Sequence, residues 1–211
     1  MYDFLVFDLD GTISDPKEGI VRSINYSLEH HGFDSRCEED IAIHIGPPLD
    51  KTFSLLIQRE DKSLISSLVT KYRERYSTVG YSENVLYDGV RESLFALHKT
   101  GNCRLGICTS KRADFAKKIL EMFGLLDLFV FVNGGDVVIE KWQQLEKLLN
   151  DRTITTNSLM IGDRFVDLTA AHRNHLHSAG VLWGYGSKDE LDKQKPKYIF
   201  EQPKQLIDLI A

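Results

Sequence analysis

Short runs of bulky apolar residues recur along this chain, and each is followed by a polar or glycine-containing turn. Runs of this kind are typical of strands that are buried on both faces of a sheet. The pattern predicts buried strands at Phe4–Phe7, Cys103–Cys108, Phe129–Val132, Leu159–Ile161 and Ala179–Leu182.

Helical periodicity fills most of the segments between these runs. It predicts helices at Val90–His98, Arg112–Phe123, Lys141–Leu149 and Phe165–Asn174, the second of which is closed by Gly124. Strand followed by helix, repeated, indicates βαβ units and a parallel sheet with helices on both faces. The expected fold class is therefore α/β with a Rossmann-like sheet, whose functional groups gather at the carboxyl ends of the strands.

Residues 15–82 interrupt this alternation, because they show helical periodicity and no convincing strand. Gly46-Pro47-Pro48 must break any helix, and helices are predicted on either side of it, including Leu49–Ile57 and Ser63–Tyr76. We therefore expect an inserted α-helical domain at 15–82, with 1–14 and 83–211 forming the core domain.

The start of the insert carries signals for a helix N-terminus. Asp15 is a good N-cap residue, Pro16 suits the first helical position, and Glu18 is placed to complete a capping box.

Composition sets outer limits on function. The chain has 211 residues, 42% of them hydrophobic and 27% charged, which is ordinary for a globular protein. Its net charge of -5 argues against nucleic-acid and membrane-surface partners. The cysteines Cys37, Cys103 and Cys108 lack metal-ligand spacing, and Met1 is not followed by a signal peptide, so we expect a cytoplasmic protein. No apolar run approaches the ~18 residues of a membrane span.

The strongest candidate for chemistry is Asp8-Leu9-Asp10-Gly11-Thr12, at the end of the first predicted strand. Carboxylates two residues apart point to the same side of an extended chain. Their repulsion at ~4 Å is ~1 kcal/mol in water and several-fold larger in a dry site. The pair therefore calls for a cation or a shared proton, and magnesium suits the oxygen ligands. Taken alone, the motif also fits a solvent-facing turn.

Polar side chains follow other predicted strands too. Asp163 comes directly after one strand, and Asp167 lies one helical turn further on, so both suit a metal site. Thr109-Ser110-Lys111 follows another strand and offers a hydroxyl and turn amides to a phosphate, or else an N-cap to the next helix. Lys141 begins a helix and is either a cation of the same cleft or an ordinary surface lysine.

These motifs, in this order, resemble the haloacid dehalogenase superfamily over essentially the whole chain. The resemblance implies that Asp8 is the nucleophile and that Asp10 is the general acid/base. It implies a magnesium site formed by Asp8, the backbone carbonyl of Asp10, and Asp163, with Asp167 assisting. The implied phosphate ligands are Gly11, Thr109, Ser110 and Lys141.

Further motifs resemble the phosphoglycolate phosphatase-like branch of subfamily I, whose helical cap lies between the first two motifs. They are Ile45–Leu49, Tyr72-Arg73-x-x-Tyr76, Cys108–Lys111 and Val181–Gly186. This implies a magnesium-dependent phosphatase that acts on a small phosphorylated metabolite, phosphoglycolate-like or a nucleoside monophosphate, through an aspartyl-phosphate.

Two assignments within that resemblance need comment. The family often has proline after the lysine of its third motif, whereas Trp142 follows Lys141 here; Lys111 is the rival, and we favour Lys141. In the cap, Arg22 and Lys51 are candidate contacts for a substrate carboxylate or second phosphate.

Other functions remain open within this fold. A pyrophosphatase or phosphomutase would use the same motifs, as would a non-catalytic magnesium-binding regulatory protein. Dehalogenases lack a counterpart of Asp10, and phosphonatases need a cap lysine that has no evident counterpart here. The expected partners are a small phosphorylated metabolite and no nucleic acid or membrane, in a monomer or homodimer.

Overall fold

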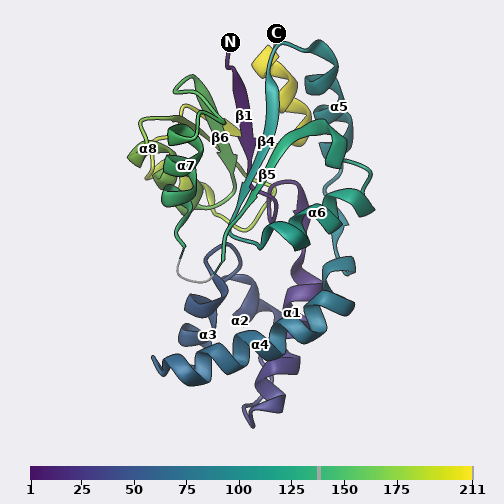
Figure 1. Cartoon of the computed structure of the whole chain (residues 1–211), viewed down its shortest axis with the longest axis vertical. Coiled ribbons are helices and arrows are strands. Elements are labelled where there is room, and N and C mark those ends of the chain that lie inside the picture. Colours follow the sequence, from purple (N-terminus) through teal and green to yellow (C-terminus); the bar gives the residue numbers. More distant parts are fainter. Residues whose placement is uncertain (137–138, 211) are drawn as a thin grey trace.

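The computed structural model describes residues 1–136 and 139–210. At its centre lies a six-stranded sheet in the order β5-β4-β1-β6-β7-β8, with every neighbouring pair parallel (Figure 1). The predicted α/β fold class is thereby confirmed. The strands are β1 (Phe4–Phe7), β4 (Arg104–Thr109), β5 (Phe129–Gly134), β6 (Ser158–Gly162), β7 (His177–Val181) and β8 (Tyr198–Phe200).

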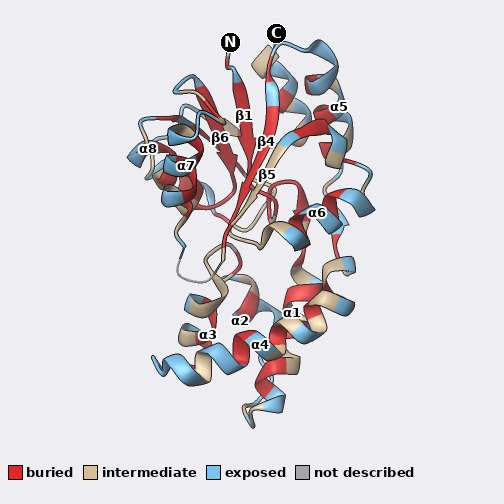
Figure 2. Cartoon of the chain, viewed as in Figure 1, coloured by how far each residue is buried: buried red, intermediate tan, exposed pale blue. Residues whose placement is uncertain are grey.

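Helices cover both faces of the sheet, as the βαβ pattern predicts. Side chains of β1 alternate between two hydrophobic clusters: Leu5 and Phe7 in one, Phe4 and Val6 in the other. Figure 2 shows the central strands of the sheet as largely buried. The first cluster includes residues of α5 (Val90–Thr100), α6 (Ala113–Met122) and the 3-10 helix η3 (Pro203–Ile210). The second includes residues of α7 (Lys141–Asn150) and α8 (Phe165–Arg173). Two short helices complete this part, η2 (Leu126–Leu128) and α9 (Lys188–Asp192).

The segment between β2 (Ser14–Asp15) and β3 (Val85–Leu86) is helical, and these two strands pair antiparallel where the chain leaves and returns. It contains α1 (Lys17–His30), α2 (Glu38–Ala42), α3 (Leu49–Ile57), α4 (Lys62–Thr78) and the short η1 (Gly80–Ser82). We call residues 17–78 the helical insert. It lies at the carboxyl ends of the strands, as Figure 1 shows, and has a hydrophobic cluster of its own. The domain boundaries at 14/15 and 82/83 stay a prediction.

The first helix of the insert begins differently from the prediction. Pro16 is the N-cap residue and Lys17 the first helical one, and the carboxylate of Asp15 accepts the Lys17 N–H at 2.9 Å. Glu18 pairs with Arg22 at 2.7 Å. The predicted capping box is therefore wrong, because Asp15 precedes the N-cap residue and Glu18 pairs with Arg22.

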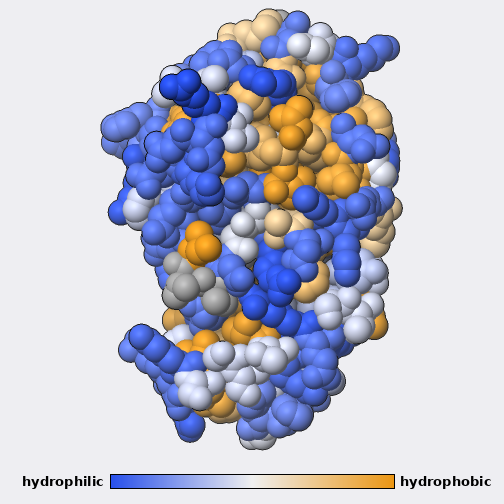
Figure 3. Space-filling model, viewed as in Figure 1, coloured by the Kyte–Doolittle hydropathy of each residue, from blue (hydrophilic) through white to orange (hydrophobic). Residues whose placement is uncertain are grey.

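Several further features of the structure concern the predicted partners or lie outside the predicted elements. The edge strand β5 exposes Val130 (59% exposed), and Figure 3 shows apolar side chains gathered beside this strand. The three cysteines are free thiols. Across the described residues, no helix has both the length and the apolar character needed to cross a membrane. β8, α9 and η3 lie outside every predicted element.

Candidate active site

The turn after β1 brings its carboxylates to the carboxyl edge of the sheet. Asp8 is 2% exposed, and one of its oxygens accepts the Leu9 N–H at 2.8 Å. Gly11 has φ +82°, and a Cβ there would lie 2.2 Å from a carboxylate oxygen of Asp163. Only glycine lets this turn approach Asp163 so closely. Gly11 thus packs against a predicted metal ligand.

Three buried carboxylates meet at this edge. Asp8, Asp163 and Asp167 each offer an oxygen, and these oxygens all lie within 4.8 Å of one another. Asp167 is held by the Arg164 N–H at 3.0 Å, at the start of α8. Asp163 accepts the Tyr185 N–H at 2.8 Å. The structure thus brings together residues that are about 155 positions apart in the chain.

Lys141 lies inside this group of carboxylates. Its Nζ is 2.8 Å from Asp8 Oδ2 and also contacts Asp167, and the side chain is only 2% exposed. Burial lowers the pKa of Lys141, but Asp167 and Asp8 outweigh burial, so the net pKa is raised and the lysine is charged. Lys141 therefore places a positive charge among these carboxylates, and its role as a phosphate ligand stays a prediction.

The single positive charge of Lys141 does not balance the three carboxylates of the cluster. Burial, followed by repulsion from Asp167 and Asp8, raises the pKa of Asp163 well above its usual range. Burial raises the pKa of Asp167 to about 6, although Lys141 opposes the shift. Buried carboxylate oxygens with unbalanced charge suit a hard divalent cation such as Mg²⁺. The donor set thus fits the predicted metal, with Asp8, Asp163 and Asp167 as the residues that would hold it.

Asp10 has a different setting from these ligands. Among the described residues its carboxylate is not part of the cluster, and binding of the metal by its backbone carbonyl stays a prediction. Asp10 Oδ2 instead pairs with Lys111 Nζ at 2.9 Å. Burial raises the pKa of Asp10, while Lys111 acts to lower it. Lys111 therefore belongs to the site, in contact with the second aspartate, whereas Lys141 contacts the first.

A cavity of about 100 Å³ lies between these residues and the helical insert. Asp8, Asp10, Thr109, Ser110 and Lys111 line it from the sheet side. The insert contributes mostly apolar side chains, together with some polar ones. The insert residues that line it are Ile20, Ile24, Ile41, Ile45, Gly46, Pro47, Leu49, Tyr72 and Tyr76, with His44, Thr52 and Arg73 as the polar ones.

The candidate cap contacts Arg22 and Lys51 do not line this cavity. Arg22 is 56% exposed and pairs with Glu18 and Glu83. Lys51 pairs with Glu140 at 2.8 Å and lines a separate cavity beside α7 and α8. Charge alone therefore did not identify which insert residues face Asp8.

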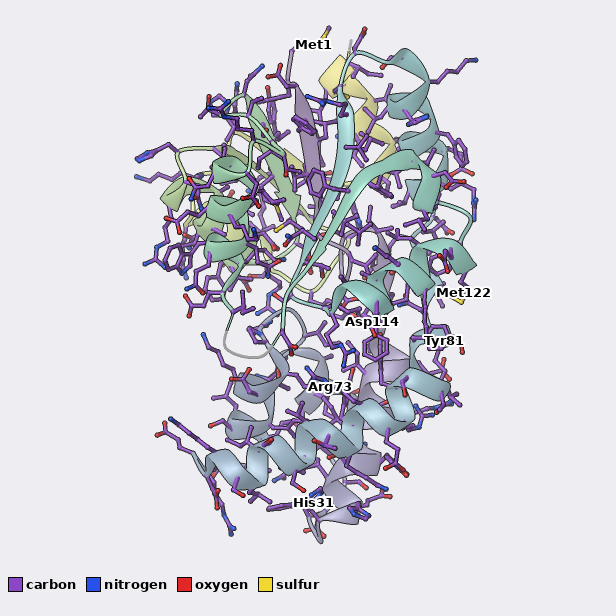
Figure 4. All side chains as sticks on the ribbon, viewed as in Figure 1. Met1, His31, Arg73, Tyr81, Asp114 and Met122 are labelled. Carbon is purple, nitrogen blue, oxygen red and sulfur yellow. The ribbon has the colours of Figure 1, made fainter. Side chains whose placement is uncertain are left out.

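Arg73 of the insert contacts both the cavity and the core, although Arg22 and Lys51 were the candidate cap contacts favoured from the sequence. Arg73 extends from the sheet-facing side of α4 and pairs with Asp136 (Figure 4). In the opposite direction, the Arg164 guanidinium donates to the backbone carbonyls of Ile43 and Ile45. The motif Tyr72-Arg73-x-x-Tyr76 was a usable signal, because residues four apart lie on one helix face.

Comparison with known proteins agrees with this geometry. The family model described as haloacid dehalogenase-like hydrolase matches residues 5–181, most of the chain. The chain belongs to this family. The resemblance inferred from the motifs is thereby confirmed, as is the predicted fold. The match extends from β1 to β7 and includes all the buried carboxylates of the cluster.

Individual relatives cover nearly the full length. A 5'-nucleotidase of Pseudomonas aeruginosa is 36% identical, over 93% of this chain and 90% of its own. A phosphoglycolate phosphatase of Photobacterium profundum is 29% identical, over 98% of this chain and 95% of its own. The crystal structure of a predicted phosphatase from Clostridium acetobutylicum superposes with a TM-score of 0.93 at 32% identity, covering 100% of this chain and 98% of the other.

Proposed function

We propose that this haloacid dehalogenase-like hydrolase is a magnesium-dependent phosphatase that cleaves a small phosphomonoester through a phosphoaspartate on Asp8. Its family and its relatives confirm the predicted class of enzyme, a hydrolase of phosphoric monoesters. The observation that carries the mechanism is the buried cluster of Asp8, Asp163 and Asp167 around Lys141.

In the first step, a carboxylate oxygen of Asp8 attacks phosphorus, and the bond from phosphorus to the leaving oxygen breaks. Asp10 gives its proton to that oxygen, so the product leaves as an alcohol. A buried carboxylate with a raised pKa suits this role, because it must be protonated at that moment. Lys141, Thr109 and Ser110 would hold the phosphoryl oxygens, whose negative charge a cation stabilises.

In the second step, water attacks the phosphorus of the phosphoaspartate while Asp10 accepts the proton of the water. The bond between phosphorus and the Asp8 oxygen breaks, which releases phosphate and restores both aspartates. Mg²⁺ bound at Asp8, Asp163 and Asp167 would neutralise charge on the phosphoryl group. The helical insert over the cavity would limit the access of other water molecules.

The substrate is expected to be phosphoglycolate-like or a nucleoside monophosphate. The insert wall is largely apolar, and its Arg73 is already paired with Asp136. Recognition of a small carboxylate would therefore require Arg73 to exchange partners, whereas an apolar group would contact the isoleucines and tyrosines directly. The relatives named above include an enzyme of each kind.

Phosphate release from a panel of substrates tests the proposal. The panel holds phosphoglycolate, nucleoside monophosphates, pyrophosphate and hexose phosphates, each with magnesium and then with chelator. We expect magnesium-dependent release from one class of monoester, abolished in Asp8→Asn and slowed in Asp10→Asn. Conversion of a hexose phosphate to its isomer without release would instead indicate a phosphomutase, and no turnover of any kind a non-catalytic protein.

A further inference from the structure

The two oxygens of Asp10 have different surroundings. Asp10 Oδ2 pairs with Lys111 Nζ at 2.9 Å, whereas the buried Oδ1 has no hydrogen-bond partner among the described residues. Asp10 also lines the cavity next to Asp8. Oδ2 is therefore anchored, and Oδ1 is left without a partner in the described part of the chain.

Lys111 is in turn held by the helical insert. Its Nζ donates to the Tyr76 hydroxyl at 2.5 Å and lies 4.5 Å from the centroid of the tyrosine ring. The lysine side chain is only 7% exposed. A flexible lysine side chain loses rotamer freedom when it is fixed, so contacts at its end decide where the ammonium group rests.

Tyr76 is itself firmly placed at the junction of α4 and the core. It is 1% exposed, and its ring stacks on Tyr72 with centroids 5.1 Å apart and an interplanar angle of 14°. On the other side its ring meets Phe115 of α6 edge to face, with centroids 5.3 Å apart. A side chain of the insert thus reaches the core through rings that lock its orientation.

We propose that Tyr76 is a positioning residue through which the helical insert orients the general acid. Its hydroxyl fixes the Lys111 ammonium, the ammonium fixes Oδ2 of Asp10, and Oδ1 is thereby directed at the leaving oxygen. This rests on the proposed function, because it assigns a role within the same reaction. In the first step, the proton on Oδ1 moves to the leaving oxygen as its bond to phosphorus breaks, and Asp10 is left ionised beside Lys111.

The leaving group reveals whether this orientation matters. A well-placed general acid contributes roughly 10²–10⁴-fold, and it contributes most where the departing oxygen is strongly basic. Disordering Asp10 therefore slows phenyl phosphate far more than 2,4-dinitrophenyl phosphate, whose phenolate departs without a proton. A defect in packing or phosphate binding would slow both substrates alike.

The experiment compares kcat/KM for a series of aryl phosphates, from 4-methoxyphenyl to 2,4-dinitrophenyl phosphate, with saturating magnesium. Tyr76→Phe removes the hydroxyl and keeps the ring. We expect a loss of about tenfold with phenyl phosphate and of less than about twofold with the dinitrophenyl ester. Lys111→Met should give the same pattern with a larger loss. Tyr26→Phe is the matched control, because its hydroxyl donates to Glu74 on an exposed part of the insert.

The outcomes separate this inference from the proposed function. If the wild-type protein hydrolyses none of the esters with magnesium, the proposed function fails. If the wild type is active and Asp10→Asn steepens the dependence on the leaving group, the proposed function stands. If kcat/KM of Tyr76→Phe then depended on the leaving group as that of the wild type does, whether at equal or at uniformly lower values, the inference alone would be overturned.

Discussion

The buried carboxylate cluster predicts an unusual response to Asp163→Asn. At an effective dielectric constant of about 20, two charges 4.8 Å apart repel by roughly 3 kcal/mol. Burial, together with repulsion from two such neighbours, raises the pKa of Asp163. Without metal, the folded protein therefore keeps a proton on Asp163 that the unfolded chain releases above a pKa of about 3.9.

The sign of the pH effect follows from that proton. A carboxyl group whose folded pKa is raised costs stability progressively, about 1.4 kcal/mol per pH unit, as pH rises from its unfolded pKa to its folded pKa. Asparagine has no proton to keep. In chelator, Asp163→Asn should thus match the wild type near pH 4 and become more stable than the wild type as pH rises to neutrality. Urea unfolding at a series of pH values measures this difference.

Magnesium should stabilise the wild type and leave Asp163→Asn almost unchanged. At a magnesium concentration of about 100 times Kd, binding stabilises the wild type by roughly 2.7 kcal/mol, which raises Tm by about 5–10 °C for a chain of this size. Asp163→Asn should show little or no rise. Asp151→Asn is the matched control, because that exposed carboxylate pairs with Lys147 away from the cluster. A full magnesium response in Asp163→Asn would refute the reasoning.

Other changes test the surroundings of the site. Lys141→Met leaves buried carboxylates uncompensated and should destabilise the metal-free protein by about 3–5 kcal/mol in urea at pH 7, with part of the loss recovered in magnesium; unchanged stability would contradict the charge balance described here. Gly184→Ala places a Cβ 2.4 Å from the Cβ of Asp163 and should abolish the magnesium-induced rise in Tm. A normal rise would contradict this, because the loop at Gly184 would then have moved to accommodate the Cβ without displacing Asp163. Hydrogen bonding to Arg75 lowers the pKa of Glu83, so this carboxylate stabilises the fold above its unfolded pKa of about 4.3, and the stabilisation disappears as pH falls through the folded pKa. Glu83→Gln should accordingly cost about 1–3 kcal/mol at pH 7 and nothing at pH 3 in urea midpoints; a difference that persists at pH 3 would contradict the ion pair as its cause.

Sequence reasoning was strongest where chemistry is tied to the ends of strands. Asp8, Thr109 and Asp163 each lie at or directly after a run of apolar residues, and parallel strands place their carboxyl ends on one edge. Lys141 was identified as the first residue of a helix, and it is found between Asp8 and Asp167. In these cases local pattern and sheet topology together determine position.

Contacts of the helical insert were beyond this reasoning. The pairing of Arg73 with Asp136 and the position of Tyr76 against Lys111 depend on how α4 docks on the core. Periodicity gives the face of a helix but not the partner of that face. Arg22 and Lys51 were chosen for charge and location in the chain, and nearby carboxylates engage both.

Short elements with little hydrophobic pattern were also missed. β8 contains only Tyr198–Phe200 and follows a polar segment, so it lacks the apolar run that identified the other strands of the sheet. α9 is five residues long, too short for a periodic pattern. Pairing with β7, rather than local sequence, makes Tyr198–Phe200 a strand.

The most direct test of the central claim is to look for the phosphoaspartate itself. The protein is mixed with a rapidly hydrolysed aryl phosphate and magnesium, quenched in acid within milliseconds, digested at low pH and examined by mass spectrometry. We predict that the peptide containing Asp8 gains the mass of one phosphoryl group, that fragmentation assigns it to Asp8, and that Asp10→Asn retains more of it. Phosphate release without any phosphorylated Asp8, or a phosphoryl group on another residue, would contradict the account.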